Sequence, residues 1–265
     1  MDYSRYKAIK VEKEGAVIVM YLNRPETFNA FDEELHSELE DILEDIGKDD
    51  EVKAAVLTGA GKAFSAGGDI KMMHRMLTEP SAAVSSTMSH TIRLINNIVD
   101  LEKPLIAAVN GDAIGLGATV ALFSDIIIAS EKARIGDPHV SVGLVAGDGG
   151  AVIWPLLVGI ARAKEFLLTG DLVPAPEAWR MGLVNKVVPH DEVMPNAIAI
   201  AKRLAAGPTL AISWTKHSIN KWLKEMVNLI LPTSIALEAN SFRTEDHREA
   251  VTAFLEKRVP KFKGR

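Results

Sequence analysis

Two glycine-rich turns are the first segments whose residue types could do chemistry. Gly67 and Gly68 precede a predicted helix that begins near Asp69, and Gly115 and Gly117 open a second, apolar helix. Glycine lets the backbone approach a ligand closely, and amides at a helix N-terminus are donors without an intrahelical partner. Such turns bind anions or developing oxyanions, and two of them could meet on one oxygen. The same glycines could equally serve only to make tight turns in a crowded fold.

Two common phosphate-binding patterns do not fit the first turn. A P-loop requires Ser or Thr after its Gly-Lys pair, but the sequence reads Gly61-Lys62-Ala63. A dinucleotide fingerprint starting at Gly59 would meet Phe64 where its third glycine belongs. The sequence therefore excludes both readings of this turn.

The composition is that of an ordinary globular protein. Hydrophobic residues make up 48% and charged residues 25% of 265 residues, and the net charge of −5 argues against a nucleic-acid-binding surface. With no cysteine there is neither a disulfide framework nor a thiolate metal site, and the histidines show no metal-ligand spacing, so we predict no metal. The longest apolar stretch, residues 113–124, is too short to span a bilayer. We expect a cytoplasmic protein without membrane contact, since the N-terminus lacks a secretory pattern.

A repeated unit of strand, glycine-rich turn and helix predicts an α/β protein. The expected strands are residues 16–22, 54–58, 105–109, 126–129 and 183–188. The expected helices are residues 31–46, 175–181, 192–206, 208–231 and 244–257, together with those that begin at the two turns. We place a soft boundary near residue 190, between a core of residues 1–190 and a helical region of residues 191–265 that could contribute to assembly.

Several motifs along the chain resemble those of the enoyl-CoA hydratase/isomerase (crotonase) family. They occur in the family's order over about residues 8 to 263. The motifs are Asn23-Arg24-Pro25, Lys62 to Lys71, Lys103 to Gly111, Ala161 to Gly170 and Ala253 to Arg258.

The resemblance implies a crotonase-like spiral of ββα repeats with a C-terminal helical annex, assembled as a homotrimer or a dimer of trimers. It implies an acyl-CoA substrate and no cofactor beyond the coenzyme A that the substrate carries. It assigns the oxyanion hole to the backbone amides of Gly68 and Leu116, in agreement with the argument from the turns. The coenzyme A contacts that it implies are Lys62, Ala63, Phe64, Ala66, Asp69 and Ile70 in one subunit, with Phe254 and Lys257 from a neighbour.

The chain departs from the family at the two catalytic glutamates of the hydratases. The matching positions hold Thr119, which we place in the substrate site, and His139. Threonine cannot relay a proton as a carboxylate does near neutral pH, whereas histidine titrates there and can act as acid or base. Ordinary two-glutamate hydration is therefore not expected.

His139 and Asp148 together resemble the pair used by family members that cleave β-dicarbonyl compounds by a retro-Claisen route. In that route histidine activates water and aspartate assists, while the oxyanion hole holds the departing enolate. Two structural readings stay open, because His139 could be a buried structural histidine and Asp148 could cap the helix that begins near Gly149. Asp137, next to Pro138, is interpreted as a turn residue rather than a catalyst.

The leading interpretation is an acyl-CoA enzyme of the enoyl-CoA hydratase/isomerase type whose acid and base work has moved to His139 and Asp148. One alternative is a carbon–carbon bond hydrolase of a β-diketone or β-ketoacyl substrate. A second is a non-catalytic relative that binds coenzyme A or RNA. The segment from Thr78 to Met88 is expected to line the acyl pocket.

Overall fold

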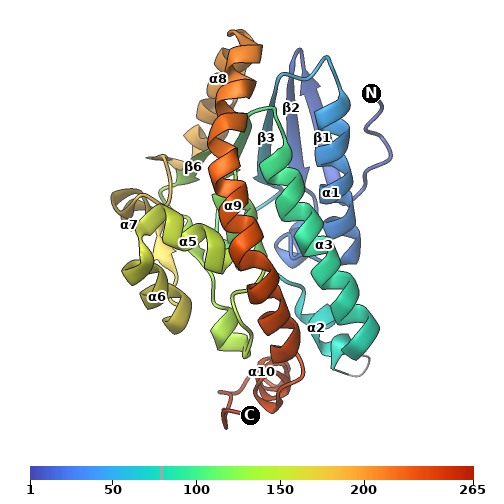
Figure 1. Cartoon of the computed structure of the whole chain (residues 1–265), viewed down its shortest axis with the longest axis vertical. Helices are drawn as coiled ribbons and strands as arrows, with labels where there is room; N and C mark the ends of the chain where they lie inside the picture. Colours follow the sequence, from blue (N-terminus) through green and yellow to red (C-terminus); the bar gives the residue numbers. More distant parts are fainter. Residues whose placement is uncertain (78–79) are drawn as a thin grey trace.

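A six-stranded sheet forms the centre of the computed structural model, which describes the backbone of residues 1–77 and 80–265 and the side chains of residues 1–77 and 88–265 (Figure 1). The strand order is β1-β2-β3-β4-β6-β9, with β1 and β2 antiparallel and all other neighbours parallel. These strands are β1 (Ile9–Glu14), β2 (Val17–Leu22), β3 (Ala54–Gly59), β4 (Leu105–Val109), β6 (Ile126–Ser130) and β9 (Lys186–Val188). A second, three-stranded sheet comprises β5 (Ala113–Ile114), β7 (Arg134–Gly136) and β8 (Val173–Pro174).

Helices connect the strands and make up most of the C-terminal region. They are α1 (Glu33–Lys48), α2 (Ile70–Met76), α3 (Pro80–Asp100), α4 (Leu116–Leu122), α5 (Gly150–Val158), α6 (Ile160–Thr169), α7 (Ala175–Met181), α8 (Val193–Ala205), α9 (Thr209–Ser241) and α10 (Glu245–Leu255). Three short 3-10 turns are η1 (Pro25–Thr27), η2 (His139–Val142) and η3 (His190–Glu192). Within the described chain, no helix combines the length and apolar character needed to cross a membrane.

Both faces of the parallel part of the sheet are buried, which explains why its strands are continuous apolar runs. In β2, Val17 and Val19 belong to the core cluster that includes α8, whereas Ile18 and Met20 belong to the larger cluster that includes α1 and α3. Figure 1 shows α1 and α3 running next to each other on one side of the sheet. The sheet is thus a rigid layer from whose strand ends the site loops emerge.

Most predicted elements match the structure, but helices α3 and α6 and the three short strands of the second sheet were not predicted, and two further differences have a clear physical reason. Strand β1 was not predicted, because Ile9–Glu14 is an edge strand in which charged residues alternate with only two apolar ones. Its pairing with β2 across Gly15, where φ is +60°, makes the hairpin. Helix α9 continues ten residues beyond its predicted end at Leu231, through Pro232, which the sequence signals as a stop.

Helix α9 is fastened to the sheet by a largely buried lysine. Lys216 Nζ donates to Asp125 Oδ2 at 2.7 Å and to the carbonyl of Lys103 at 2.9 Å. The same Asp125 oxygen accepts from the backbone amide of Leu105 at 2.7 Å. Burial lowers the pKa of Lys216 and raises that of Asp125, so each charge depends on the other to offset its lost hydration.

Replacing Lys216 with methionine should lower the free energy of unfolding by about 2–3 kcal/mol, because the Asp125 carboxylate loses its partner. The penalty stays below that of a fully enclosed pair, since the Asp125 side chain is 23% exposed. Urea unfolding of the wild type and Lys216→Met measures it. Lys224→Met is the control on the same helix, because its partner Asp100 is 63% exposed and the loss should be under ~1 kcal/mol. Equal losses in both variants would contradict this account.

Candidate active site

The two glycine-rich turns lie against each other. Ser65 pairs with Ala113 in an isolated bridge, and the amide of Ile114 donates to the carbonyl of Ser65 at 2.9 Å. A Cβ atom on Gly67, whose φ is +85°, would lie 2.7 Å from the Ile114 carbonyl oxygen, and one on Gly117 would lie 2.6 Å from Ser65 Cβ. Only glycine permits this approach, which places the start of α4 next to the loop before α2.

The amides of Gly68 and Leu116 are left without a backbone partner in the described structure. In the bridge between Phe31 and Gly68, the Phe31 amide donates to the Gly67 carbonyl and the Asp69 amide donates to the Phe31 carbonyl. Neither hydrogen bond uses the Gly68 amide. Leu116 is the first residue of α4, and its N-cap, Gly115, has no side chain to accept its amide. Both residues border one inner cavity, which also contains His139. These are the features required of an oxyanion hole.

His139 is surrounded by three carboxyl groups. Its Nδ1 forms a short hydrogen bond with Asp137 Oδ1. On the other side of the ring, Nε2 lies 3.4 Å from Asp148 Oδ2 and 3.9 Å from Glu238 Oε1. All four residues are buried. One imidazole and three carboxyl groups are therefore close enough to exchange protons within a site of low hydration.

Asp148 is held by Thr119 and also interacts with the backbone amide of Gly150, the first residue of α5. Thr119 Oγ1 donates to Asp148 Oδ1 at 3.0 Å. The N-cap of α5 is Gly149, in a left-handed conformation and without a side-chain cap bond. A Cβ atom on Gly149 would lie 2.8 Å from Thr119 Cγ2, so glycine keeps this corner open. Thr119, which the sequence analysis places in the substrate site, thus orients Asp148 in the structure.

Asp137 corrects the sequence analysis, which interpreted it as a turn residue. Its carboxylate bonds to His139 Nδ1, and this fixes the ring and leaves Nε2 facing the cavity. The close approach depends on Gly150, where a Cβ atom would lie 1.9 Å from Asp137 Oδ2. The partnership was hidden because Pro138 between the two residues suggested only a turn.

Glu238 was missed altogether by the sequence analysis. It lies on α9, far along the chain from His139, and its Oε2 atom accepts no hydrogen bond from any described residue. A Cβ atom on Gly147 would come within 2.7 Å of that oxygen, so another glycine makes room for it. The available signal was a single acidic residue within the otherwise apolar and polar-neutral stretch from Leu231 to Ser241.

The protonation states follow from burial and mutual charge. Burial by itself lowers the pKa of His139, but the charges of Asp137 and Asp148 outweigh it and hold that pKa well above the ordinary value. Burial raises the pKa of Asp148, and it raises the pKa of Glu238 well above its usual range, reinforced by the neighbouring carboxylates. The site therefore favours a protonated imidazole paired with Asp137 and a Glu238 that binds its proton more tightly than an exposed glutamate does.

An outer crevice of about 510 Å³ leads to this cluster. It shares Gly68, Met73 and His139 with the inner cavity, so the two form one path from solvent. Of the predicted coenzyme A contacts, it is lined by Ala66, Asp69, Ile70 and Phe254. Phe254 belongs here to the same chain, and its side chain is 61% exposed.

The remaining predicted contacts lie elsewhere. Phe64 is fully buried and Ala63 nearly so, and the carbonyl of Ala63 accepts from Asn29 Nδ2 at 2.9 Å. Lys62 is exposed, and Lys257 is an exposed residue just after α10 with φ of +55°. None of these four borders the outer crevice, so any contact from them to a ligand would be made at its rim or beyond it.

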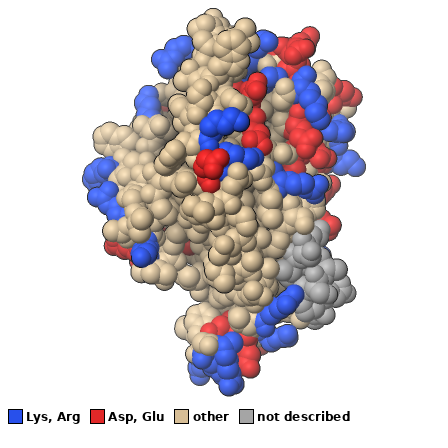
Figure 2. Space-filling view, in the orientation of Figure 1, with Lys and Arg blue, Asp and Glu red and all other residues tan. Residues whose placement is uncertain are grey.

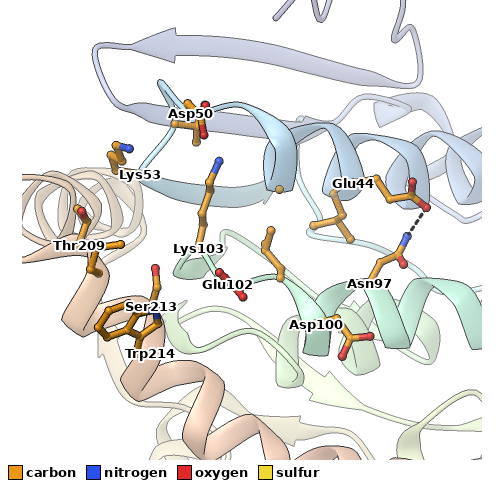
Figure 3. A pocket seen from close by; sticks show the side chains of 15 residues that line it. Glu44, Asp50, Lys53, Asn97, Asp100, Glu102, Lys103, Thr209, Ser213 and Trp214 are labelled. Carbon is orange, nitrogen blue, oxygen red and sulfur yellow. Dashed lines mark hydrogen bonds between the residues drawn. The ribbon is translucent and has the colours of Figure 1, made fainter.

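A second crevice of about 460 Å³ lies between the ends of α1 and α3 and the start of α9 (Figure 3). Several of its polar side chains are engaged in the structure itself: Lys103 Nζ donates to carbonyls at the end of α1, and Asn97 Nδ2 donates to Glu44. No group of titratable side chains converges in it as His139 and its neighbours do. The candidate active site is therefore the crevice that ends at His139.

Among the described side chains, two groups could offer ligand atoms to a metal ion: Asp137, His139 and Asp148, and His36, Glu40 and His90. The second group was concealed in the sequence, since its histidines lie on α1 and α3. In both groups the ligand atoms already bond to one another. The absence of a metal stays a prediction.

The chain is similar over its length to proteins of one family. The enoyl-CoA hydratase/isomerase family model matches residues 12–265. The short-chain-enoyl-CoA hydratase of Clostridium acetobutylicum is 39% identical over 257 residues, covering 96% of this chain and 97% of the relative. The crotonyl-CoA hydratase of Syntrophomonas wolfei is 36% identical over 258 residues, covering 97% and 98%. A crystal structure of an enoyl-CoA hydratase/isomerase from Mycobacterium paratuberculosis matches with a TM-score of 0.88 and 38% identity, covering 92% and 97%, which confirms the predicted fold class.

Asp137→Asn should lower the pKa of His139, because the neutral amide no longer favours the imidazolium form. The raised pKa of folded His139 stabilises the wild type fully below about pH 6.5, and this contribution is lost as the pH rises through the folded value. The variant should therefore lose part of that pH dependence. NMR titration of the His139 ring proton measures the pKa. His247, whose Nδ1 bonds to the carbonyl of Val142, is the internal reference. An unchanged His139 pKa would contradict the pairing.

Proposed function

The chain belongs to the enoyl-CoA hydratase/isomerase (crotonase) family, and we propose that it acts on an acyl-CoA thioester by stabilising negative charge on the thioester oxygen. The observation that carries the proposal is the pair of unpartnered amides of Gly68 and Leu116 beside His139. Oriented donors in a site of low hydration stabilise an oxyanion or enolate without reorganisation during the reaction. The names of the three relatives and of the matching family model all contain the terms hydratase or isomerase.

The proton chemistry would be carried by His139, Asp148 and Glu238 in place of the family's two glutamates. In hydration, a water held next to His139 Nε2 and Asp148 Oδ2 would give its proton to the Asp148 carboxylate as its oxygen bonds to the β-carbon. The electrons of the double bond move toward the thioester oxygen, where the two amides hold the enolate. Glu238, which retains its proton because of burial, then protonates the α-carbon.

Carbon–carbon bond hydrolysis of a β-diketone or β-ketoacyl substrate is the second candidate. It is favoured by one observation, the enclosure of a single imidazole by three carboxyl groups where hydratases of the family use glutamates. A water that gives one proton to Asp148 would add to one carbonyl. The bond to the central carbon would then break to release a carboxylic acid, and the central carbon would leave as an enolate held by Gly68 and Leu116. Protonation of the central carbon by Glu238 completes the balance.

A non-catalytic relative that binds coenzyme A or RNA is the third candidate and has the least support. A binding protein has no need to bury three carboxyl groups around a histidine, since each costs hydration. The net charge of −5 gives RNA no general attraction. The cytoplasmic location, the absence of a cofactor and the lack of nucleic-acid or membrane partners remain predictions.

We also propose that the subunits assemble through the apolar side of α9, as a homotrimer or a dimer of trimers. Figure 2 shows a broad surface without charged side chains in the middle of the molecule, where α9 runs in the same view. Trp214, Trp222 and Leu229 on this helix are each at least 60% exposed. A large exposed apolar patch is typical of a surface that another protein covers.

Trp222→Glu should shift the mass measured by sedimentation toward the monomer, because a buried carboxylate would lack a partner in the interface. The wild type should sediment as a trimer or hexamer. Lys221→Glu, one residue away, is the control for the change of charge. A monomeric wild type would contradict the assembly proposal.

The activity is tested by following crotonyl-CoA and a β-diketone with the wild type and His139→Ala, and by identifying the products. We expect crotonyl-CoA hydration that falls by about 10²–10⁴ in kcat in the variant, the usual worth of general acid–base catalysis. Robust hydration in His139→Ala would contradict its role. Diketone cleavage by the wild type that disappears in the variant would establish the second candidate instead.

Glu238→Gln is the companion variant, since glutamine matches the shape of the protonated acid but cannot release a proton. A loss of kcat with little change in KM is expected for either reaction. Thr58→Val, a buried hydroxyl remote from the cluster that donates to the Ala108 carbonyl, controls for general loss of packing and hydrogen bonding.

A further inference from the structure

The inner cavity has a polar wall that the proposed proton chemistry does not use. The cavity measures about 40 Å³, room for only a few atoms unless its walls yield. Four methionines border it and can yield: Met72, Met73, Met76 and Met88. Met88 is the one residue of the predicted acyl-pocket segment, residues 78–88, whose side chain falls within the described set. Apart from His139, Asp148 and Glu238, the polar side chains among the described lining residues are His36 and Thr91.

His36 is held in one orientation by a carboxylate behind it. Its Nδ1 lies 3.2 Å from Glu40 Oε1, and Glu40 also contacts His90 Nδ1 at 2.8 Å and Arg93 Nε at 3.1 Å. With Arg93 bound, the Glu40 carboxylate is an acceptor, so His36 carries its proton on Nδ1. In the neutral imidazole with this tautomer, the opposite nitrogen, Nε2, is an acceptor.

Among the described residues, the acceptor nitrogen of His36 has one weak contact. Thr91 Oγ1 is 3.4 Å away, at the long end of the hydrogen-bond range. The His36 side chain is only 3% exposed, so water from outside compensates little for that weak contact. A buried acceptor with an inadequate partner costs free energy that a ligand donor would recover.

We propose that His36, with Thr91 beside it, recognises a hydroxyl group on the acyl chain of the substrate. The hydroxyl would donate to His36 Nε2 and displace the long contact to Thr91, while the methionines pack against the carbons. The preferred substrates are therefore short hydroxyacyl or hydroxyenoyl thioesters rather than plain alkyl ones. This inference rests on the proposed acyl-CoA function, whose carbonyl would lie at Gly68 and Leu116 in the same cavity.

Binding of unreactive thioethers tests the inference without turnover. The probes are matched pairs of S-alkyl and S-(ω-hydroxyalkyl) coenzyme A with equal numbers of chain atoms, from butyl with 3-hydroxypropyl to hexyl with 5-hydroxypentyl. Titration calorimetry should show that the wild type binds the hydroxyl member of at least one pair about tenfold more tightly, the effect of one well-made buried hydrogen bond. His36→Leu should reverse that preference, and His36→Gln, which keeps a polar end, should retain part of it.

His90→Leu is the matched control, because His90 contacts the same Glu40 oxygen but does not border the cavity. It should leave the ratio of the two affinities unchanged, and circular dichroism checks that each variant is folded. Equal wild-type affinities within every pair would overturn the inference and leave the proposed function standing. If His36→Leu kept the preference for the hydroxyl, His36 would be only a structural link between α1 and α3. If no thioether bound at any length, the proposed acyl-CoA function would fail and the inference with it.

Discussion

The close contact of two glycine turns is the constraint on which the site depends. Gly67 and Gly117 leave no space for a Cβ atom, so the loop before α2 and the start of α4 meet backbone to backbone. The isolated bridge between Ser65 and Ala113 adds backbone pairing between the same two loops. As a result, two amides that the secondary structure leaves unpaired are held on one cavity by rigid elements, as electrostatic stabilisation of an oxyanion requires.

The second organising feature is the burial of three carboxyl groups that each lie within 4 Å of the His139 ring nitrogens. Three neighbouring carboxyl groups and one imidazole cannot all be ionised in a poorly hydrated site. Asp137 takes the role of counter-ion to His139, and this leaves Asp148 and Glu238 to differ in how readily they bind a proton. Their titrations belong to the group rather than to single residues, so the cluster can both accept and donate a proton during one reaction.

Helix α9 connects the stability of the scaffold to the chemistry of the site. Lys216 fastens one part of it to the sheet through Asp125, and Glu238 reaches the cavity about 33 Å further along the helix. Between them, Ser234 Oγ donates to the carbonyl of Gly147 at 2.9 Å, next to the loop that carries Asp148. The helix also presents its exposed tryptophans to solvent, so the same element closes the site and supplies the apolar surface proposed for assembly.

The sequence by itself determined the α/β class, most helices and strands, the two turns and the family resemblance. These depend on local periodicity, on glycine at particular positions and on short motifs, all of which can be recognised within a window of a few residues. His139 and Asp148 were also recognisable, because the motifs on either side place them. Tertiary structure alone decided that Asp137 orients His139, that Glu238 enters the site from α9 and that His36 borders the cavity. Such contacts arise where the chain returns to the same place after tens of residues, and no local pattern encodes which side chains then converge.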